Sequence, residues 1–165
     1  MRTIDNINSL NKSEFLSIFG NVFEKTESVA LKVFELKPFK DFDDIISKMQ
    51  KIYEEYDKVK ILEILNSHPE LAIEKKLTTD SKLEQTSANL NECSEEEFKE
   101  FKKLNIEYKT KFGFPFIIAV KGKNKNEILI NFRERIQNDL NKEFLEAKNQ
   151  VKKIASFRLK DILSI

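Results

Sequence analysis

Apolar side chains recur every third or fourth residue along most of this chain, which is the spacing of amphipathic helices. The pattern predicts helices over residues 13–23, 26–38, 41–53, 59–67 and 94–113, and one long or two consecutive helices over 126–162. Ser13, Asp41 and Ser94 stand where each could cap a helix N-terminus. An interruption is expected near residues 138–141, and the residues before Ser13 are predicted to be a polar lead.

Residues 114–120, with the sequence Phe-Pro-Phe-Ile-Ile-Ala-Val, break the helical pattern. By propensity the run is a buried strand, but no other segment is predicted as a strand that could pair with it. We therefore predict an extended segment threaded between helices, with backbone N–H and C=O groups that need other partners. A polar ligand could be one such partner.

Length and composition agree with a helical protein. At 165 residues the chain is long enough for one core, and its 3 Gly and 3 Pro are few for a protein rich in turns. The expected fold is all-α: a single compact domain over residues 1–165, with several amphipathic helices and one extended apolar segment between helices.

The charges nearly cancel, since 29 Lys and Arg residues stand against 28 Asp and Glu residues. No overall field therefore favours nucleic acid or an anionic membrane as a partner. Cys93, the only cysteine, cannot form an internal disulfide and has no second cysteine for a metal site. No apolar stretch has membrane-spanning length and no signal-peptide pattern opens the chain, so we expect a cytoplasmic protein.

His68 is the only histidine of the chain, and it directly precedes Pro69. A residue before proline is pushed out of the α region, so the preceding helix should stop near Ser67 and leave His68 on an extended corner. Such a corner can direct an imidazole into a cleft, where it could transfer a proton near neutral pH. A lone histidine is nevertheless more often structural than catalytic.

Residues 77–85 allow two interpretations. Ser81 and Glu84 have the spacing of a capping box, in which both side chains satisfy backbone N–H groups. If Thr78 or Thr79 is the cap instead, Ser81, Glu84 and Gln85 stand on one face of a helix and can converge on a ligand. The spacing alone does not decide between the two.

Arg158 lies on the apolar stripe of the last predicted helix, four residues after Ile154 and four before Ile162. An arginine in that position usually snorkels to solvent or pairs with a carboxylate, for which Glu70 or Glu84 would serve. The functional alternative is that it holds an anionic ligand.

Four motifs occur together in the order and spacing of one known family. They are His68-Pro69-Glu70-Leu71-Ala72, Leu77-Thr78-x-x-Ser81-x-x-Glu84-Gln85, Lys111-Phe112-Gly113-Phe114-Pro115-Phe116-Ile117 and Phe157-Arg158-Leu159. Shorter matches at Phe23-Glu24, Lys37-Pro38-Phe39 and Leu104-Asn105-x-x-Tyr108 extend the agreement over nearly the whole chain. The chain resembles the decarboxylases of 2-oxo-4-hydroxy-4-carboxy-5-ureidoimidazoline (OHCU), which act in urate breakdown.

The resemblance implies an all-α protein, usually a homodimer, that converts OHCU to (S)-allantoin without a metal or an organic cofactor. It places the catalytic histidine at His68, and Glu84 is expected to act beside it at the ring or ureido nitrogens. The implied substrate-binding residues are Pro69, Ser81, Lys82, Leu83, Glu84, Gln85, Phe116, Ile117, Ile118, Ala119, Val120 and Arg158. In this arrangement Thr78 is the helix cap, which favours the ligand-binding interpretation of Ser81.

The sequence departs from the family pattern at three places. Thr26-Glu27-Ser28 replaces a common Ser-Pro-Trp, and Ile73 and Asn89 each replace a glycine close to the matched motifs. These changes leave two alternatives open. The chain could process another ureido or imidazoline acid, or it could be a catalytically inactive helical interaction module.

Overall fold

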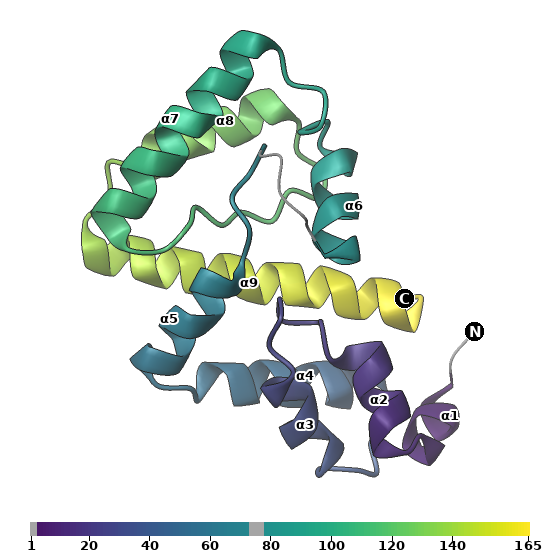
Figure 1. The fold of residues 1–165 in the computed structure, drawn as a ribbon. Coiled ribbons are helices and arrows are strands. Elements are labelled where there is room, and N and C mark those ends of the chain that lie inside the picture. The colour runs from purple at the N-terminus through teal and green to yellow at the C-terminus, as the bar shows by residue number, and fades with distance from the viewer. Residues whose placement is uncertain (1–2, 73–77) are drawn as a thin grey trace. The chain divides into compact units, whose positions relative to one another are not determined.

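The computed structural model of the chain describes residues 3–72 and 78–165, and all regular structure among them is α-helical. The helices are α1 (Ile4–Ser9), α2 (Lys12–Phe19), α3 (Ser28–Phe34), α4 (Phe42–Glu54), α5 (Lys58–Ser67), α6 (Thr79–Ser87), α7 (Glu95–Phe112), α8 (Lys125–Arg135) and α9 (Leu140–Leu163), as Figure 1 shows. The all-α prediction is confirmed. None of these helices is both long and apolar enough to cross a membrane.

The chain packs as two compact units. The first contains residues Met1–Ser67 and Lys152–Ile165, and the second contains His68–Val151. Helix α9 supplies residues to both units. The assignment of residues 1–165 to one domain remains a prediction.

The first unit contains α1 to α5 and the end of α9 around an aromatic core. Phe15 and Phe19 lie with ring centroids 4.6 Å apart, and Phe23 stacks on Tyr53 at 4.8 Å. Asp41 caps α4 by accepting a hydrogen bond from the backbone N–H of Asp44, as predicted. These aromatic pairs each add about 0.5–1.5 kcal/mol to the stabilisation from burial alone.

The N-terminal end differs from the prediction. The expected polar lead forms helix α1, which Thr3 caps in a box with Asn6. Asn11, rather than Ser13, caps α2, and α2 ends at Phe19 before Val22 and Phe23. The difference arises because Thr3 and Asn11 belong to residue types that occur both at helix caps and in turns, so they do not by themselves decide between helix and coil.

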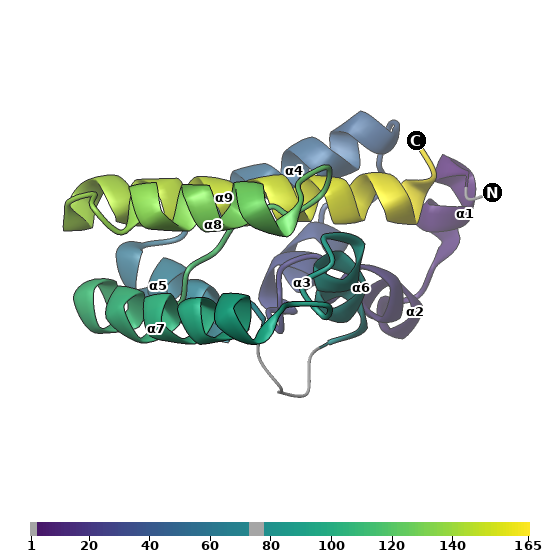
Figure 2. The same ribbon diagram turned by 90° about the horizontal axis from the view of Figure 1, so that it is seen from above.

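The second unit contains α6, α7, α8 and the beginning of α9. Helix α7 begins with a capping box between Ser94 and Glu97, and it ends at Gly113, whose φ of 79° lies in the left-handed region. The cap at Ser94 was predicted, and each of the two features is typical of a sharply ended helix. Helices α7 and α8 lie side by side, and the chain between them runs back along their length (Figure 1, Figure 2).

The returning chain includes residues 114–120, which are extended and contain no regular structure. Phe116 stacks on Phe132 of α8 with ring centroids 3.8 Å apart, and Tyr108 of α7 meets both rings edge-on. The prediction of an extended apolar segment between helices is confirmed. Its aromatic anchor explains why it stays extended without strand partners.

Candidate active site

His68 is the first residue after α5, which ends at Ser67 as predicted. The side chain of His68 is 8% exposed, so the imidazole lies in a largely desolvated environment. Pro69 sets the extended corner that follows the helix, because a residue before proline avoids the α conformation. The single titratable imidazole of the chain is therefore buried on a turn rather than on a helix face.

Gln85 of α6 holds the backbone just after this corner. Its side-chain Oε1 accepts a hydrogen bond from the N–H of Ala72 at 3.1 Å, and its Nε2 donates to the carbonyl oxygen of Glu70 at 3.2 Å. Gln85 is 7% exposed. One amide side chain thus fixes two backbone groups of the His68 motif.

Thr78 caps α6 by accepting a hydrogen bond from the N–H of Ser81 at 3.3 Å. The capping-box interpretation of Ser81 and Glu84 is therefore wrong, and both side chains lie within the helix. Ser81 is buried and Glu84 is half-buried, whereas Lys82 and Leu83 are exposed. Some of the predicted substrate-binding residues of α6 therefore face the protein interior, and the others face solvent.

Two buried side chains hold residues 116–120, the extended segment of the predicted site. Arg135 donates from Nη1 to the carbonyl oxygen of Ile117 at 2.7 Å, and its guanidinium lies over the Phe116 ring at 4.4 Å. Gln150 of α9 accepts from the N–H of Ala119 at 2.9 Å. Within the described residues, no hydrogen bond is recorded for the backbone N–H and C=O of Ile118, which lies between these two anchored residues.

Arg135 is itself fixed by a buried carboxylate. Glu143 is 0% exposed and accepts hydrogen bonds from Arg135 Nε and Nη2 at 2.9 and 2.6 Å. Tyr108 Oη donates to the same carboxylate at 2.5 Å, and Asn138 Nδ2 donates to its second oxygen at 2.8 Å. The pKa of Tyr108 is raised well above its usual value, chiefly by burial and secondly by the hydrogen bond from Tyr108 to Glu143. The phenol therefore stays protonated.

Arg158 belongs to the first unit, where it forms a buried ion pair. Its Nη2 donates to Glu24 Oε2 at 2.8 Å, and its Nη1 donates to the carbonyl oxygen of Asn21 at 2.9 Å. Arg158 is 6% exposed and Glu24 is 0% exposed. The expected pairing with a carboxylate is confirmed, and the carboxylate is that of Glu24, 134 positions away in sequence. Pairing of Arg158 with Glu70 or Glu84 remains a prediction.

Two of the departures from the family pattern, at Asn89 and Thr26, fit the local structure around them. Asn89, in place of a glycine, has a φ of 58°, and asparagine tolerates this left-handed conformation better than most residues. Thr26 is buried and donates from Oγ1 to the carbonyl oxygen of Glu24 at 2.9 Å. Ile73 and Leu77 of the predicted motifs lie outside the described residues.

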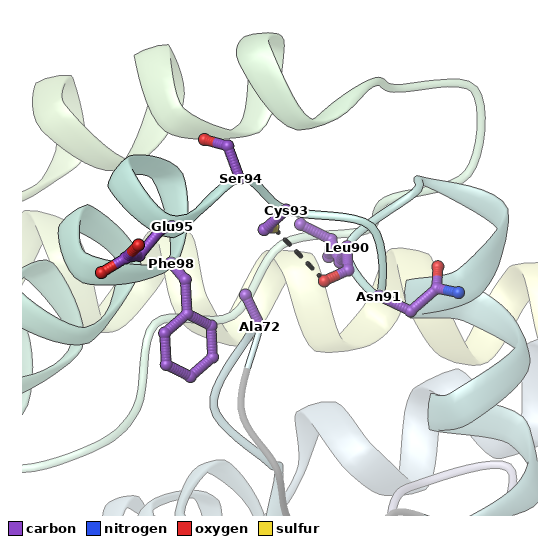
Figure 3. A pocket seen from close by; sticks show the side chains of 7 residues that line it. All are labelled: Ala72, Leu90, Asn91, Cys93, Ser94, Glu95 and Phe98. Carbon is purple, nitrogen blue, oxygen red and sulfur yellow. Dashed lines mark hydrogen bonds between the residues drawn. The ribbon is translucent and has the colours of Figure 1, made fainter.

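A cavity of about 450 Å³ lies elsewhere in the second unit, near the start of α7. Figure 3 shows its lining, which comes from Ala72, Leu90, Asn91, Cys93, Ser94, Glu95 and Phe98. None of the residues predicted for the site lines it. One lining residue, Ala72, nevertheless donates its N–H to Gln85 of the predicted site.

Cys93 lines this cavity and donates a hydrogen bond to the carbonyl oxygen of Leu90. The pKa of the thiol is raised, chiefly by burial and secondly by repulsion from Glu97. The thiol is therefore protonated at neutral pH and a poor nucleophile.

We expect Cys93→Ser to leave turnover unchanged, and we expect slow alkylation of Cys93 by iodoacetamide at pH 7. A large loss of activity in the variant, measured against wild type in the same assay, would mean that the thiol takes part in the reaction.

The sequence did not single out Arg135, Glu143, Gln150 or Glu24 as partners of the site. Gln150 could have been found, because it interrupts the apolar stripe of α9 much as Arg158 does. Glu24 could also have been found, because it stands in the family match Phe23-Glu24, whereas Arg135 and Glu143 become recognisable only when tertiary packing buries them. Among the described residues, no group of three or more His, Cys, Asp or Glu side chains is placed to hold a metal ion.

The chain matches proteins of known families over nearly its full length. The sequence profile of OHCU decarboxylase matches residues 8–160. The "2-oxo-4-hydroxy-4-carboxy-5-ureidoimidazoline decarboxylase" of Haloferax volcanii is 33% identical over 98% of this chain and 96% of its own length. The "Uric acid degradation bifunctional protein" of Bacillus sp. (strain TB-90) is 39% identical over 98% of this chain.

Comparison of the fold with solved structures agrees with the sequence comparison. A crystal structure of (S)-allantoin synthase superposes with a TM-score of 0.79 over 98% of this chain, at 26% identity. The chain spans only 32% of the Bacillus protein and 54% of the crystallised one, so it corresponds to one part of those longer chains. Because the family profile covers nearly all of it, the chain belongs to the OHCU decarboxylase family.

Proposed function

We propose that this chain decarboxylates OHCU to (S)-allantoin in urate degradation. The observation that carries the proposal is the family match over residues 8–160. The resemblance of the His68-Pro69 motif supports His68, the sole histidine of the chain, as the catalytic residue. Its burial on a fixed corner supports the same conclusion, because a proton-transfer group must be oriented and shielded from bulk water.

The reaction breaks the bond between the ring carbon and the carboxylate, and CO2 leaves without the bonding electrons. The electron pair passes into the imidazoline ring, whose nitrogens delocalise it, so the substrate supplies its own electron sink. A proton must then reach one face of the ring to set the configuration of allantoin. The protein is therefore required to orient the substrate, stabilise the spreading charge and deliver the proton.

Each task has a candidate residue. His68 handles the proton, and Glu84 binds the ring or ureido nitrogens with Ser81 and Gln85 beside it on α6. The backbone groups of Ile118 bind polar atoms of the substrate, and Arg158 balances the negative charge of the substrate. The hydrogen bonds of Ile117 and Ala119 to Arg135 and Gln150 support this role for the segment, because they fix the direction of the remaining backbone groups.

The remaining members of the predicted substrate set form the walls of the site. Pro69, Phe116 and Val120 contribute shape, and Lys82 and Leu83 at the exposed side of α6 act at its edge. We further propose a homodimer that works in the cytoplasm without a cofactor. The family resemblance supports the dimer, and light scattering of the purified chain tests it.

The assay for the proposed function uses OHCU generated freshly from urate. We expect the chain to consume the substrate and release CO2 faster than the spontaneous reaction, in proportion to protein concentration. Consumption at the spontaneous rate would favour an inactive module. Turnover of another ureido acid in place of OHCU would favour the related-substrate alternative.

Arg158→Lys keeps the positive charge but loses the planar fork that can hold two oxygens at once. We expect KM to rise about tenfold to a hundredfold, because a charge-assisted hydrogen bond contributes about 1.5–3 kcal/mol. Glu24→Gln is the matched variant, since it breaks the same ion pair but keeps the guanidinium. If both variants lose melting temperature equally and neither changes KM, Arg158 is a structural residue.

A further inference from the structure

A second amide side chain holds the backbone that follows His68. Asn105 lies in the middle of α7, is 3% exposed, and donates from Nδ2 to the carbonyl oxygen of Leu71 at 3.0 Å. Gln85 binds the neighbouring groups, the carbonyl oxygen of Glu70 and the N–H of Ala72. Two helices thus fix three consecutive residues, beginning two positions after the imidazole.

The clamped backbone is conformationally unusual. Ala72 has a φ of 52°, in the left-handed region that non-glycine residues rarely occupy. Such a conformation persists only where surrounding contacts over-determine it. The amides of Gln85 and Asn105 provide these contacts, because they hold Ala72 and the two residues before it.

The hydrogen bonding of Asn105 is unbalanced. Its Nδ2 is engaged, but no donor in residues 3–72 or 78–165 reaches its buried Oδ1. Within the described residues, then, only one of the two polar atoms of this amide makes a hydrogen bond. The donated bond to Leu71 is what this side chain contributes.

We propose that Asn105 is a positioning residue for His68. It holds the carbonyl group of Leu71, completes the clamp begun by Gln85, and thereby fixes the imidazole at the angle needed for proton transfer. The proposal rests on the proposed decarboxylation, and it adds to the site a residue that does not touch the substrate. Asn105 belongs to the motif Leu104-Asn105-x-x-Tyr108, for which the sequence alone indicated no role.

The test compares Asn105→Asp and Asn105→Leu with wild type. Both lose the donor, but the aspartate keeps the size of the side chain and the leucine also removes the unpaired acceptor. We expect kcat, corrected for the folded fraction, to fall about 10- to 100-fold in both, because a misplacement of about 1 Å can reduce a rate 100-fold. KM should stay within about twofold, since substrate contacts are intact.

A second readout does not depend on activity. The chain has one histidine, so a single imidazole signal in a nuclear magnetic resonance spectrum reports on His68. We expect this signal to shift or broaden in both variants. Asn131→Asp is the control, because Asn131 also donates to a backbone carbonyl but lies on the surface of α8. It should leave both kcat and the imidazole signal unchanged.

The outcomes separate this proposal from the proposed function. An unchanged imidazole signal with wild-type kcat per folded molecule in both Asn105 variants would overturn the positioning role. A fall in activity that only follows the unfolded fraction would overturn it as well. If wild type itself fails to turn over OHCU, the proposed function fails, and the imidazole signal still decides whether Asn105 positions His68.

Discussion

His68→Asn is expected to lower kcat by about 10² to 10⁴, the usual effect of losing a general acid or base. No other imidazole in the chain can replace the missing group. The fold and much of the binding should remain, because Pro69 sets the corner and Gln85 holds the backbone after it. Circular dichroism and kcat are to be measured on the same preparation.

The pH profile of the wild-type enzyme adds a direct link to this residue. If His68 transfers the proton, the pH dependence of kcat should contain a step that coincides with the titration of the single imidazole signal. That step should be missing in the variant. Normal turnover per folded molecule, together with a lower melting temperature, would instead assign His68 a structural role.

Glu143→Ala is expected to give the largest loss of stability. Glu143 accepts hydrogen bonds from Arg135, Tyr108 and Asn138 and is completely buried. Removing it leaves the guanidinium of Arg135 buried without a counter-charge, which costs about 3–5 kcal/mol. For a chain of this size the melting temperature should fall by roughly 6–20 °C, measured by calorimetry.

Glu100→Ala is the matched control, because Glu100 also pairs with an arginine, Arg133, at 2.6 Å. That pair is partly exposed, with 51% of the arginine side chain accessible, so its loss should cost at most about 1 kcal/mol. Replacing both partners, as in Arg135→Met with Glu143→Leu, should restore much of the stability. Equal losses in Glu143→Ala and Glu100→Ala would contradict the assigned importance of the buried pair.

The predictions that succeeded rest on local chemistry. Asp41 and Ser94 cap helices through backbone N–H groups three residues away, as their places in the sequence predicted. The extended segment was predictable because proline and a dense apolar run oppose an exposed helix. Such signals need only neighbours in sequence, so they survive whatever the tertiary packing is.

The features that the sequence left undetermined are partners distant in sequence. Arg158 was expected to pair with a carboxylate, but the sequence did not point to Glu24, on which packing places it. The clamp at Asn105 and the support of Ile117 and Ala119 also join residues from different elements. An amphipathic pattern shows that a polar residue lies on a buried face, but it does not show which residue it meets there.

The enantiomeric composition of the allantoin product tests the central claim most directly. Protonation in free solution favours neither face of the ring and gives a racemate, whereas a buried, oriented imidazole delivers the proton to one face. With freshly generated OHCU and wild-type chain, we expect an excess of (S)-allantoin that rises with protein concentration and disappears in His68→Asn. A racemic product at every concentration of wild-type protein would contradict the assignment of this chain as a stereospecific OHCU decarboxylase.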